Sequence, residues 1–100
     1  MRTINFKVKE QRIKNVGSIA FVYGGTDNYL NLKFEFDDNW TGCIKAISFG
    51  SKDLAMLLNK DGSCVVPKEA FDETQLSFYL VGKKENYRIQ THPFVIKLGG

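Results

Sequence analysis

The side chains that could carry out catalysis are few in this chain of 100 residues, which has one histidine, His92, and two cysteines, Cys43 and Cys64. A nucleophilic serine, threonine or cysteine needs a base within hydrogen-bond reach. A lone histidine beside Pro93 is more typical of a strand end on the surface. A catalytic zinc site needs three protein ligands, and nothing in the spacing of these three residues brings them together. We therefore expect no enzyme, no metal and no cofactor.

The two cysteines lie 21 residues apart and belong to no CxxC pair. A small secreted scaffold held by disulfides would carry more cysteines. We expect two reduced thiols that pack as small hydrophobic side chains. A disulfide between Cys43 and Cys64 is the alternative.

The charged residues favour no charged ligand. The 14 lysines and arginines and 11 aspartates and glutamates give a formal net charge of +3. Basic residues in segment 7–14 are expected on the solvent side of an edge strand, where lysine discourages aggregation, and not on a nucleic-acid surface. The Gly24-Gly25 pair lacks the lysine and the long helix of a phosphate-binding loop.

The tyrosines are the best candidates for an interaction surface, because tyrosine is enriched at interfaces. The four are Tyr23, Tyr29, Tyr79 and Tyr87. The alternative is that tyrosine simply fits a half-buried strand.

The elements that must position these side chains are mostly strands, because apolar residues recur with a period of two. We expect eight or nine short strands, at 3–9, 18–23, 29–36, 43–49, 54–58, 63–66, 75–81, 87–91 and 94–98. Residues 54–58 are one of the two longest apolar runs, and the turn after them favours a strand over a helix. Residues 13–17 are expected to be a loop. Strand 43–49 is apolar on both faces, which predicts a central strand covered on each side.

One short helical turn is expected near residues 67–72, with Pro67 at its first position. Because the connections are too short for parallel crossovers, all strands are expected to pair antiparallel. The fold class is therefore all-β, an antiparallel β-sandwich of immunoglobulin-like appearance, with a barrel less favoured, and residues 1–100 form a single domain. The predicted core side chains are Leu32, Phe34, Phe36, Trp40, Phe49, Val66, Phe78, Leu80, Ile89 and Ile96.

No membrane partner is expected, because the longest apolar runs have five residues and a membrane-spanning helix needs about 20. The first twelve residues also lack the apolar stretch of a secretory signal. We expect a protein that is made in a cytoplasm.

A set of motifs in a fixed order goes beyond composition. In chain order they are Phe34-Glu35-Phe36-Asp37, Trp40, Gly42, Lys45, Phe49, the run Asp61-Gly62-Ser63-Cys64-Val65-Val66-Pro67-Lys68-Glu69, Tyr79-Leu80-Val81-Gly82 and Arg88-Ile89-Gln90-Thr91. This order resembles the N-terminal β-sandwich domain of upper baseplate and tail-fibre-like structural proteins of phages that infect Gram-positive bacteria. The resemblance covers roughly residues 28–98, and its motifs are structural rather than catalytic. The stem and receptor-binding module that family members often carry are not among these 100 residues.

The resemblance implies a virion structural module, a baseplate or tail component made in the host cytoplasm. It would assemble with copies of itself or with other phage structural proteins, through an exposed strand or around Tyr23 to Tyr29. Two alternatives stay open. One is a phage-encoded accessory protein that binds and inhibits a host defence protein, and the other is a carbohydrate-binding module supported by the tyrosines.

Overall fold

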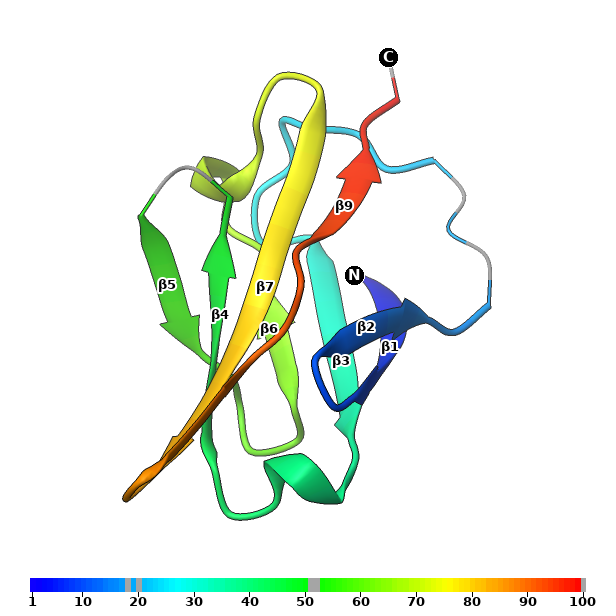
Figure 1. Ribbon diagram of the computed structural model, residues 1–100. Helices are drawn as coiled ribbons and strands as arrows, with labels where there is room; N and C mark the ends of the chain where they lie inside the picture. The colour runs from blue at the N-terminus through cyan, green and yellow to red at the C-terminus, as the bar shows by residue number, and fades with distance from the viewer. Residues whose placement is uncertain (18, 20, 51–52, 100) are drawn as a thin grey trace.

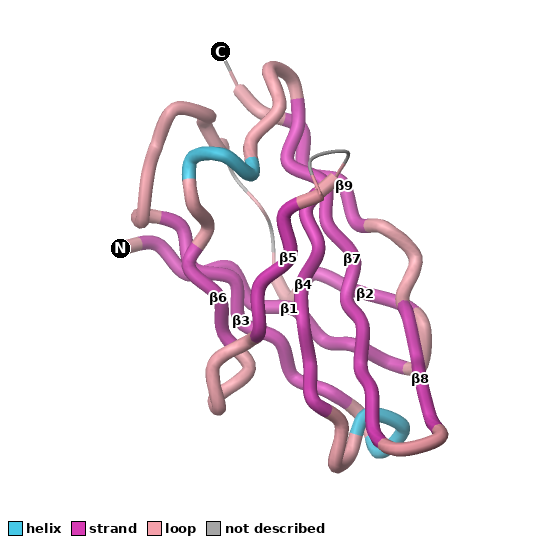
Figure 2. The backbone as a smooth tube through the Cα atoms, turned by 90° about the vertical axis from the view of Figure 1, so that its left-hand side faces the viewer, coloured by secondary structure: helices cyan, strands magenta, loops and turns pink. Residues whose placement is uncertain are grey.

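The computed structural model describes residues 1–17, 19, 21–50 and 53–99, which form two β-sheets packed face to face (Figure 1, Figure 2). The four-stranded sheet has the spatial order β2 (Arg12–Asn15), β1 (Arg2–Lys9), β3 (Leu30–Phe36) and β6 (Ser63–Val65). The five-stranded sheet has the order β5 (Leu54–Leu57), β4 (Ile44–Phe49), β7 (Gln75–Lys84) and β8 (Tyr87–Gln90), and β9 (Phe94–Lys97) pairs with the first half of β7. Two single-turn 3-10 helices, η1 (Asp38–Trp40) and η2 (Lys68–Ala70), lie in connections.

The all-β prediction is confirmed, with nine strands among the described residues. The apolar run 54–58 contains a strand, β5, as its following turn predicted. The helical turn expected near 67–72 is η2, although Pro67 occupies the cap position before the helix and not its first helical position.

The prediction of purely antiparallel pairing is wrong, because β1 and β3 are parallel from the pair Arg2–Leu30 to the pair Val8–Phe36. Parallel neighbours need a long crossover. The segment between Lys9 and Leu30 provides it, since β2 runs back along β1 and the described residues after β2 lead to the start of β3, beside the start of β1 (Figure 1). The expectation of short connections overlooked this segment.

The strand expected at 18–23 is also wrong for the residues of that segment that the structure describes, 19 and 21–23, which form no strand. Ser18 and Ala20 lie outside the described residues. The strand occurs earlier, as β2, in the segment expected to be a loop. The hairpin partner of Val8 is Ile13, whose side chain enters the core, and this burial outweighs the irregular alternation of the segment.

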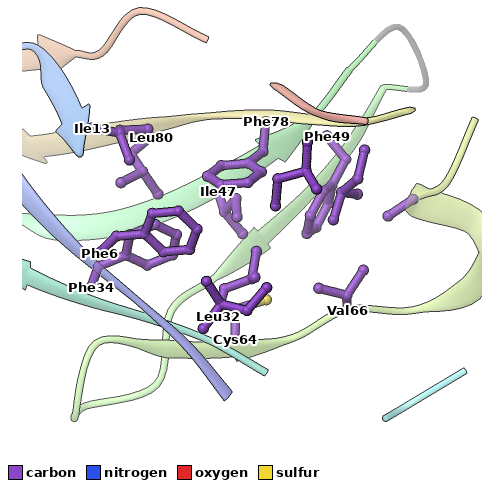
Figure 3. Close-up of a cluster of buried hydrophobic side chains, with 14 of the residues drawn as sticks. Phe6, Ile13, Leu32, Phe34, Ile47, Phe49, Cys64, Val66, Phe78 and Leu80 are labelled. Atoms are coloured by element: carbon purple, nitrogen blue, oxygen red, sulfur yellow. The ribbon is translucent and has the colours of Figure 1, made fainter. Parts of the chain in front are cut away.

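The core between the sheets is built on aromatic rings (Figure 3). Phe6 and Phe34, neighbours on the four-stranded sheet, stack with ring centroids 5.2 Å apart. Both meet the edge of Phe78 from the facing sheet, at 5.6 and 5.8 Å, a geometry that aromatic quadrupoles favour. All ten predicted core side chains are buried here or pack against the buried cluster, Phe36 and Ile89 being the two that are only partly buried.

Trp40 closes the end of the sandwich where η1 lies. The Asp37 carboxylate caps η1 by accepting a hydrogen bond from the Asn39 N–H at 3.1 Å. The turn directs Trp40 inward, where it is fully buried and its indole N–H donates to the Glu10 carbonyl at 2.8 Å. Its ring lies against Gly82, where a Cβ atom would come within 2.7 Å of it. Only glycine fits there without a shift of the ring.

A turn at residues 59–62 carries the chain from β5 in one sheet to β6 in the other. Gly62 adopts a φ of +82°, and a Cβ atom there would lie 2.5 Å from the Phe34 carbonyl oxygen. The close approach lets the Phe34 N–H donate to the Gly62 carbonyl at 2.9 Å. This turn therefore ties the β5 edge of the five-stranded sheet to β3.

Candidate interaction surface

The four candidate tyrosines lie in three separate places. Tyr23 and Tyr29 belong to the loop between β2 and β3, Tyr79 lies on the outer face of β7, and Tyr87 begins β8. The structure thus brings only Tyr23 and Tyr29 together, as lining residues of one cavity.

Tyr23 and Tyr29 belong to a cluster of exposed aromatic side chains that we call the aromatic end, formed by Phe21, Tyr23 and Tyr29. These side chains are 72%, 54% and 50% exposed. The rings of Phe21 and Tyr23 lie 6.3 Å apart with 25° between their planes. Arg2 bonds to the backbone of two of these residues. Its backbone N–H donates to the Tyr29 carbonyl at 2.9 Å, and its guanidinium donates to the Phe21 carbonyl. The cavity that these residues border measures about 160 Å³.

Tyr87 has a structural role at the opposite end of the sandwich. Its hydroxyl donates to the Asn39 carbonyl at 2.7 Å. The Lys84 ammonium lies 5.1 Å from the centroid of the Tyr87 ring and donates to the Thr41 carbonyl at 2.8 Å. Together these contacts fasten the β7–β8 hairpin to η1.

The outer face of the five-stranded sheet carries apolar side chains that no other described element covers. The register places Ala46 of β4 between Leu57 of β5 and Val81 of β7. Ile44 lies two residues before Ala46 and so points to the same side. We call Ile44, Ala46, Leu57 and Val81 the outer patch. Ile44 and Leu57 are its most exposed members, at 70% and 69%.

The outer patch corrects one prediction about β4 and confirms another. The strand is central, with β5 and β7 on its two sides. Its inner face is covered, since Ile47 and Phe49 are fully buried, but its outer face with Ile44 is bare among the described residues. The signal for this site in the sequence is the apolar character of both faces of β4, which predicts that both are covered but does not say what covers them.

A groove of about 340 Å³ adjoins the outer patch, and it is lined by Ile44 and Leu57, by the turn 59–62 and by Phe34 and Phe36. The groove joins the exposed aliphatic side chains to the edge of the aromatic core. An apolar protrusion on a partner could therefore contact both at once.

Polar groups on the walls of the groove are already engaged. The Lys45 ammonium lies 5.2 Å from the centroid of the Phe36 ring and donates to the Cys43 carbonyl at 3.3 Å. Asp61 accepts hydrogen bonds from the Ser63 hydroxyl at 2.6 Å and the Ser63 N–H at 3.1 Å. These bonds, the hydroxyl first, lower the pKa of Asp61 below its usual 3.8 and outweigh the effect of desolvation. The carboxylate stays charged at neutral pH.

The cavity beside His92 contains neither of the two cysteines considered as catalytic partners, Cys43 and Cys64. The His92 N–H donates to the Gln11 carbonyl at 2.9 Å, and the shallow cavity beside His92 is lined by Gln11, Gln90, Thr91 and Pro93, with no cysteine. Cys43 and Cys64 are buried free thiols, and burial raises the pKa of Cys64. In the part of the chain that the structure describes, no three His, Cys, Asp or Glu side chains lie close enough together to hold a metal ion.

Comparison with known proteins adds no relative. No family model, curated protein sequence or solved structure matches the chain significantly. Within the described residues, no helix is long and apolar enough to cross a membrane.

Proposed function

We propose that the chain is a virion structural module, a baseplate or tail component that acts by protein–protein assembly and has no catalytic role. The observation that carries this proposal is the bare outer patch, together with the motif order that resembles phage baseplate domains. Covering a fully exposed isoleucine or leucine side chain contributes about 1.5–3 kcal/mol. Ile44 and Leu57 leave most of that free energy available to a partner.

The position of the outer patch on the face of a sheet fits a protein partner better than a small molecule. Small-molecule sites are concave and bury most of the ligand. The patch lies on the face of a sheet, and contiguous exposed apolar area of this kind marks interaction sites in soluble proteins. We include in the proposal that the two-sheet arrangement is a variant of the immunoglobulin-like sandwich, a class that recurs in assembly proteins.

The test is the presence of the protein in purified phage particles and its dependence on the outer patch. We expect mass spectrometry of particles to detect the chain, and Ile44→Lys to reduce its incorporation. The matched control is Val16→Lys, which changes an exposed aliphatic residue, 47% exposed, just after β2. Absence from particles, with the folded protein retained in the host lysate, would refute the virion proposal and favour the host-binding accessory protein.

The aromatic end favours carbohydrate binding as a second candidate. Two nearly parallel exposed rings, with Arg2 beside them, offer a stacking surface and a hydrogen-bond donor to one sugar ring. Binding of soluble oligosaccharides from the host cell wall should be lost in Tyr23→Ala. If binding survives this change, or if wild-type protein binds none of them, the candidate is wrong.

A further inference from the structure

Edge strands expose unpaired backbone groups, and proteins protect them with charged side chains, proline or shortness. Among the described residues the edge strands are β2, β6, β5 and, along the two halves of β7, β8 and β9. β2 carries Arg12 and Lys14, β8 carries Arg88, and β9 carries Lys97 and follows Pro93. β6 has three residues and ends just before Val66-Pro67. Four of the five edges are thus protected.

β5 is the exception. Its sequence, Leu54-Ala55-Met56-Leu57, has no charge, no proline and no glycine, and Leu58 continues the apolar run. Ala55 and Leu57 are exposed, whereas Leu54, Met56 and Leu58 pack partly against the core. No described strand pairs with the outer edge of β5, which faces the viewer in Figure 2.

The direction of the backbone groups along β5 follows from one hydrogen bond. The Leu58 N–H donates to the Lys45 carbonyl at 2.9 Å. In an antiparallel pair the residues alternate between those that bond to the neighbour and those that do not. Leu54 and Met56 therefore bond toward β4, and the N–H and C=O groups of Ala55 and Leu57 point away from the sheet.

From these observations we infer that β5 pairs antiparallel with β5 of a second copy of this chain, across a two-fold axis at Met56. The two five-stranded sheets then join into one continuous sheet. Ala55 of each copy faces Leu57 of the other and exchanges two backbone hydrogen bonds with it. An isologous contact of this kind is the usual basis of homodimers. The inference deepens the proposed function, because it identifies a second copy as one assembly partner.

The register is set by the apolar run. Centred at Met56, the pairing also places Leu54 opposite Leu58 of the other copy, so each of the five residues meets an apolar one. Moving the axis to Ala55 would oppose Leu57 to Asp53, and moving it to Leu57 would oppose Ala55 to Asn59. The charged outward residues of the sheet, Lys83, Arg88 and Lys97, belong to β7, β8 and β9 on the other side of β4, so these three charges lie away from the axis.

The first experiment measures mass and amide exchange across concentration. We expect the mass to double as the wild-type concentration rises, and the amides of Ala55 and Leu57 to become protected in the same range. Leu57→Lys and Ala55→Pro should stay monomeric. Val95→Lys, which alters an exposed aliphatic residue of β9 in the same sheet, should still dimerise. A wild-type monomer at every concentration, or rapid exchange at Ala55 and Leu57 in the dimer, would overturn the inference.

The second experiment fixes the register with engineered cysteines. Across the proposed axis, the two Met56 residues form a non-hydrogen-bonded pair, with Cα atoms about 4.5 Å apart, a separation that a disulfide spans. Oxidation should therefore link Met56→Cys into a covalent dimer. Ala55→Cys is the control and should not link to itself, because the two positions are offset along the strands. A linked Ala55→Cys and an unlinked Met56→Cys would contradict this register.

The two proposals fail in different ways. A chain that stays monomeric but is present in particles would refute the β5 pairing and leave the structural role intact. A β5 dimer that is absent from particles would do the reverse.

Discussion

The two faces of the five-stranded sheet are made from the same strands but have opposite surroundings. On the inner face Ile47, Phe49 and Phe78 are fully buried against the other sheet, whereas on the outer face Ile44 and Leu57 are 70% and 69% exposed. Both faces of β4 carry apolar side chains, and among the described residues there is only one other sheet to cover them. Hydrophobicity in a sequence therefore tells which residues must be covered, but it does not tell which molecule covers them.

The sharpest test of this difference is Phe78→Ala. The Phe78 ring packs within 5.6 to 6.5 Å of the rings of Phe6, Phe34, Phe49 and Phe94, measured between centroids. Removing such a ring leaves a cavity, and we expect a loss of about 3–5 kcal/mol in the free energy of unfolding. Urea denaturation measures it. Tyr79→Ala, one residue along on the outer face, is the control, and a loss as large as that of Phe78→Ala would contradict the comparison.

Gly82→Ala tests the inner face by adding an atom. The new Cβ would lie 2.7 and 2.8 Å from two atoms of the Trp40 ring and 3.2 Å from the Cys43 Cβ. Overpacking of this kind costs about 1–3 kcal/mol. We expect a lower urea midpoint and a changed tryptophan fluorescence, since Trp40 is the only tryptophan. Lys83→Ala, the adjacent outward position, should change neither by a comparable amount.

The sequence predicted most of this inner face. Strict alternation in β3 and β7 identified which side chains enter the core, and the turn after residues 54–58 identified β5 as a strand. It did not predict the parallel pairing of β1 with β3. That pairing depends on the crossover that contains β2. The alternation of apolar residues in β2 is irregular, so the sequence does not indicate that this segment is a strand paired with β1.

The candidate interaction surface is harder to recognise in the sequence than the fold. Tyrosine enrichment at interfaces pointed to four residues, and the structure gives one of them, Tyr87, a structural hydrogen bond to Asn39. Ile44 and Leu57 were visible only as strand residues. An alternating strand looks the same whether its second face meets the same chain or another one, so their exposure could not be read from the sequence.

Acid should lower the stability of the fold through Asp37, which caps η1 beside Trp40. Desolvation alone would raise its pKa, but hydrogen bonds from the Glu10 N–H and from Asn39, with the charge of Lys9, bring the pKa below the usual 3.8. A lowered pKa in the folded state stabilises the fold above the unfolded value, and this contribution is lost as the pH falls through the folded value. We expect the urea concentration at the unfolding midpoint to decrease as the pH is lowered below 3.8, the usual pKa of the carboxyl group.

The Asp37 contribution can be separated from that of other carboxylates, Asp61 among them. Asp37→Asn keeps a side chain that can cap η1 but cannot titrate, so it should flatten the acid dependence. Asp38→Asn, one residue along and not the cap of η1, is the control. Equal acid dependence in wild type and Asp37→Asn would show that the charge of Asp37 does not stabilise the fold.

The smallest expected effect is that of Ile44→Thr, and it is the most direct statement about the outer face. Threonine keeps the β-branch that suits a strand, and Ile44 is already 70% exposed. The free energy of unfolding of the monomer should therefore change by no more than about 0.5 kcal/mol. Ile47→Thr, three residues along on the buried face, should cost far more, because it places an unpartnered hydroxyl in the core. If Ile44→Thr were as costly as Ile47→Thr in a monomeric protein, the outer face would already be covered by this chain, and no partner would be needed to bury it.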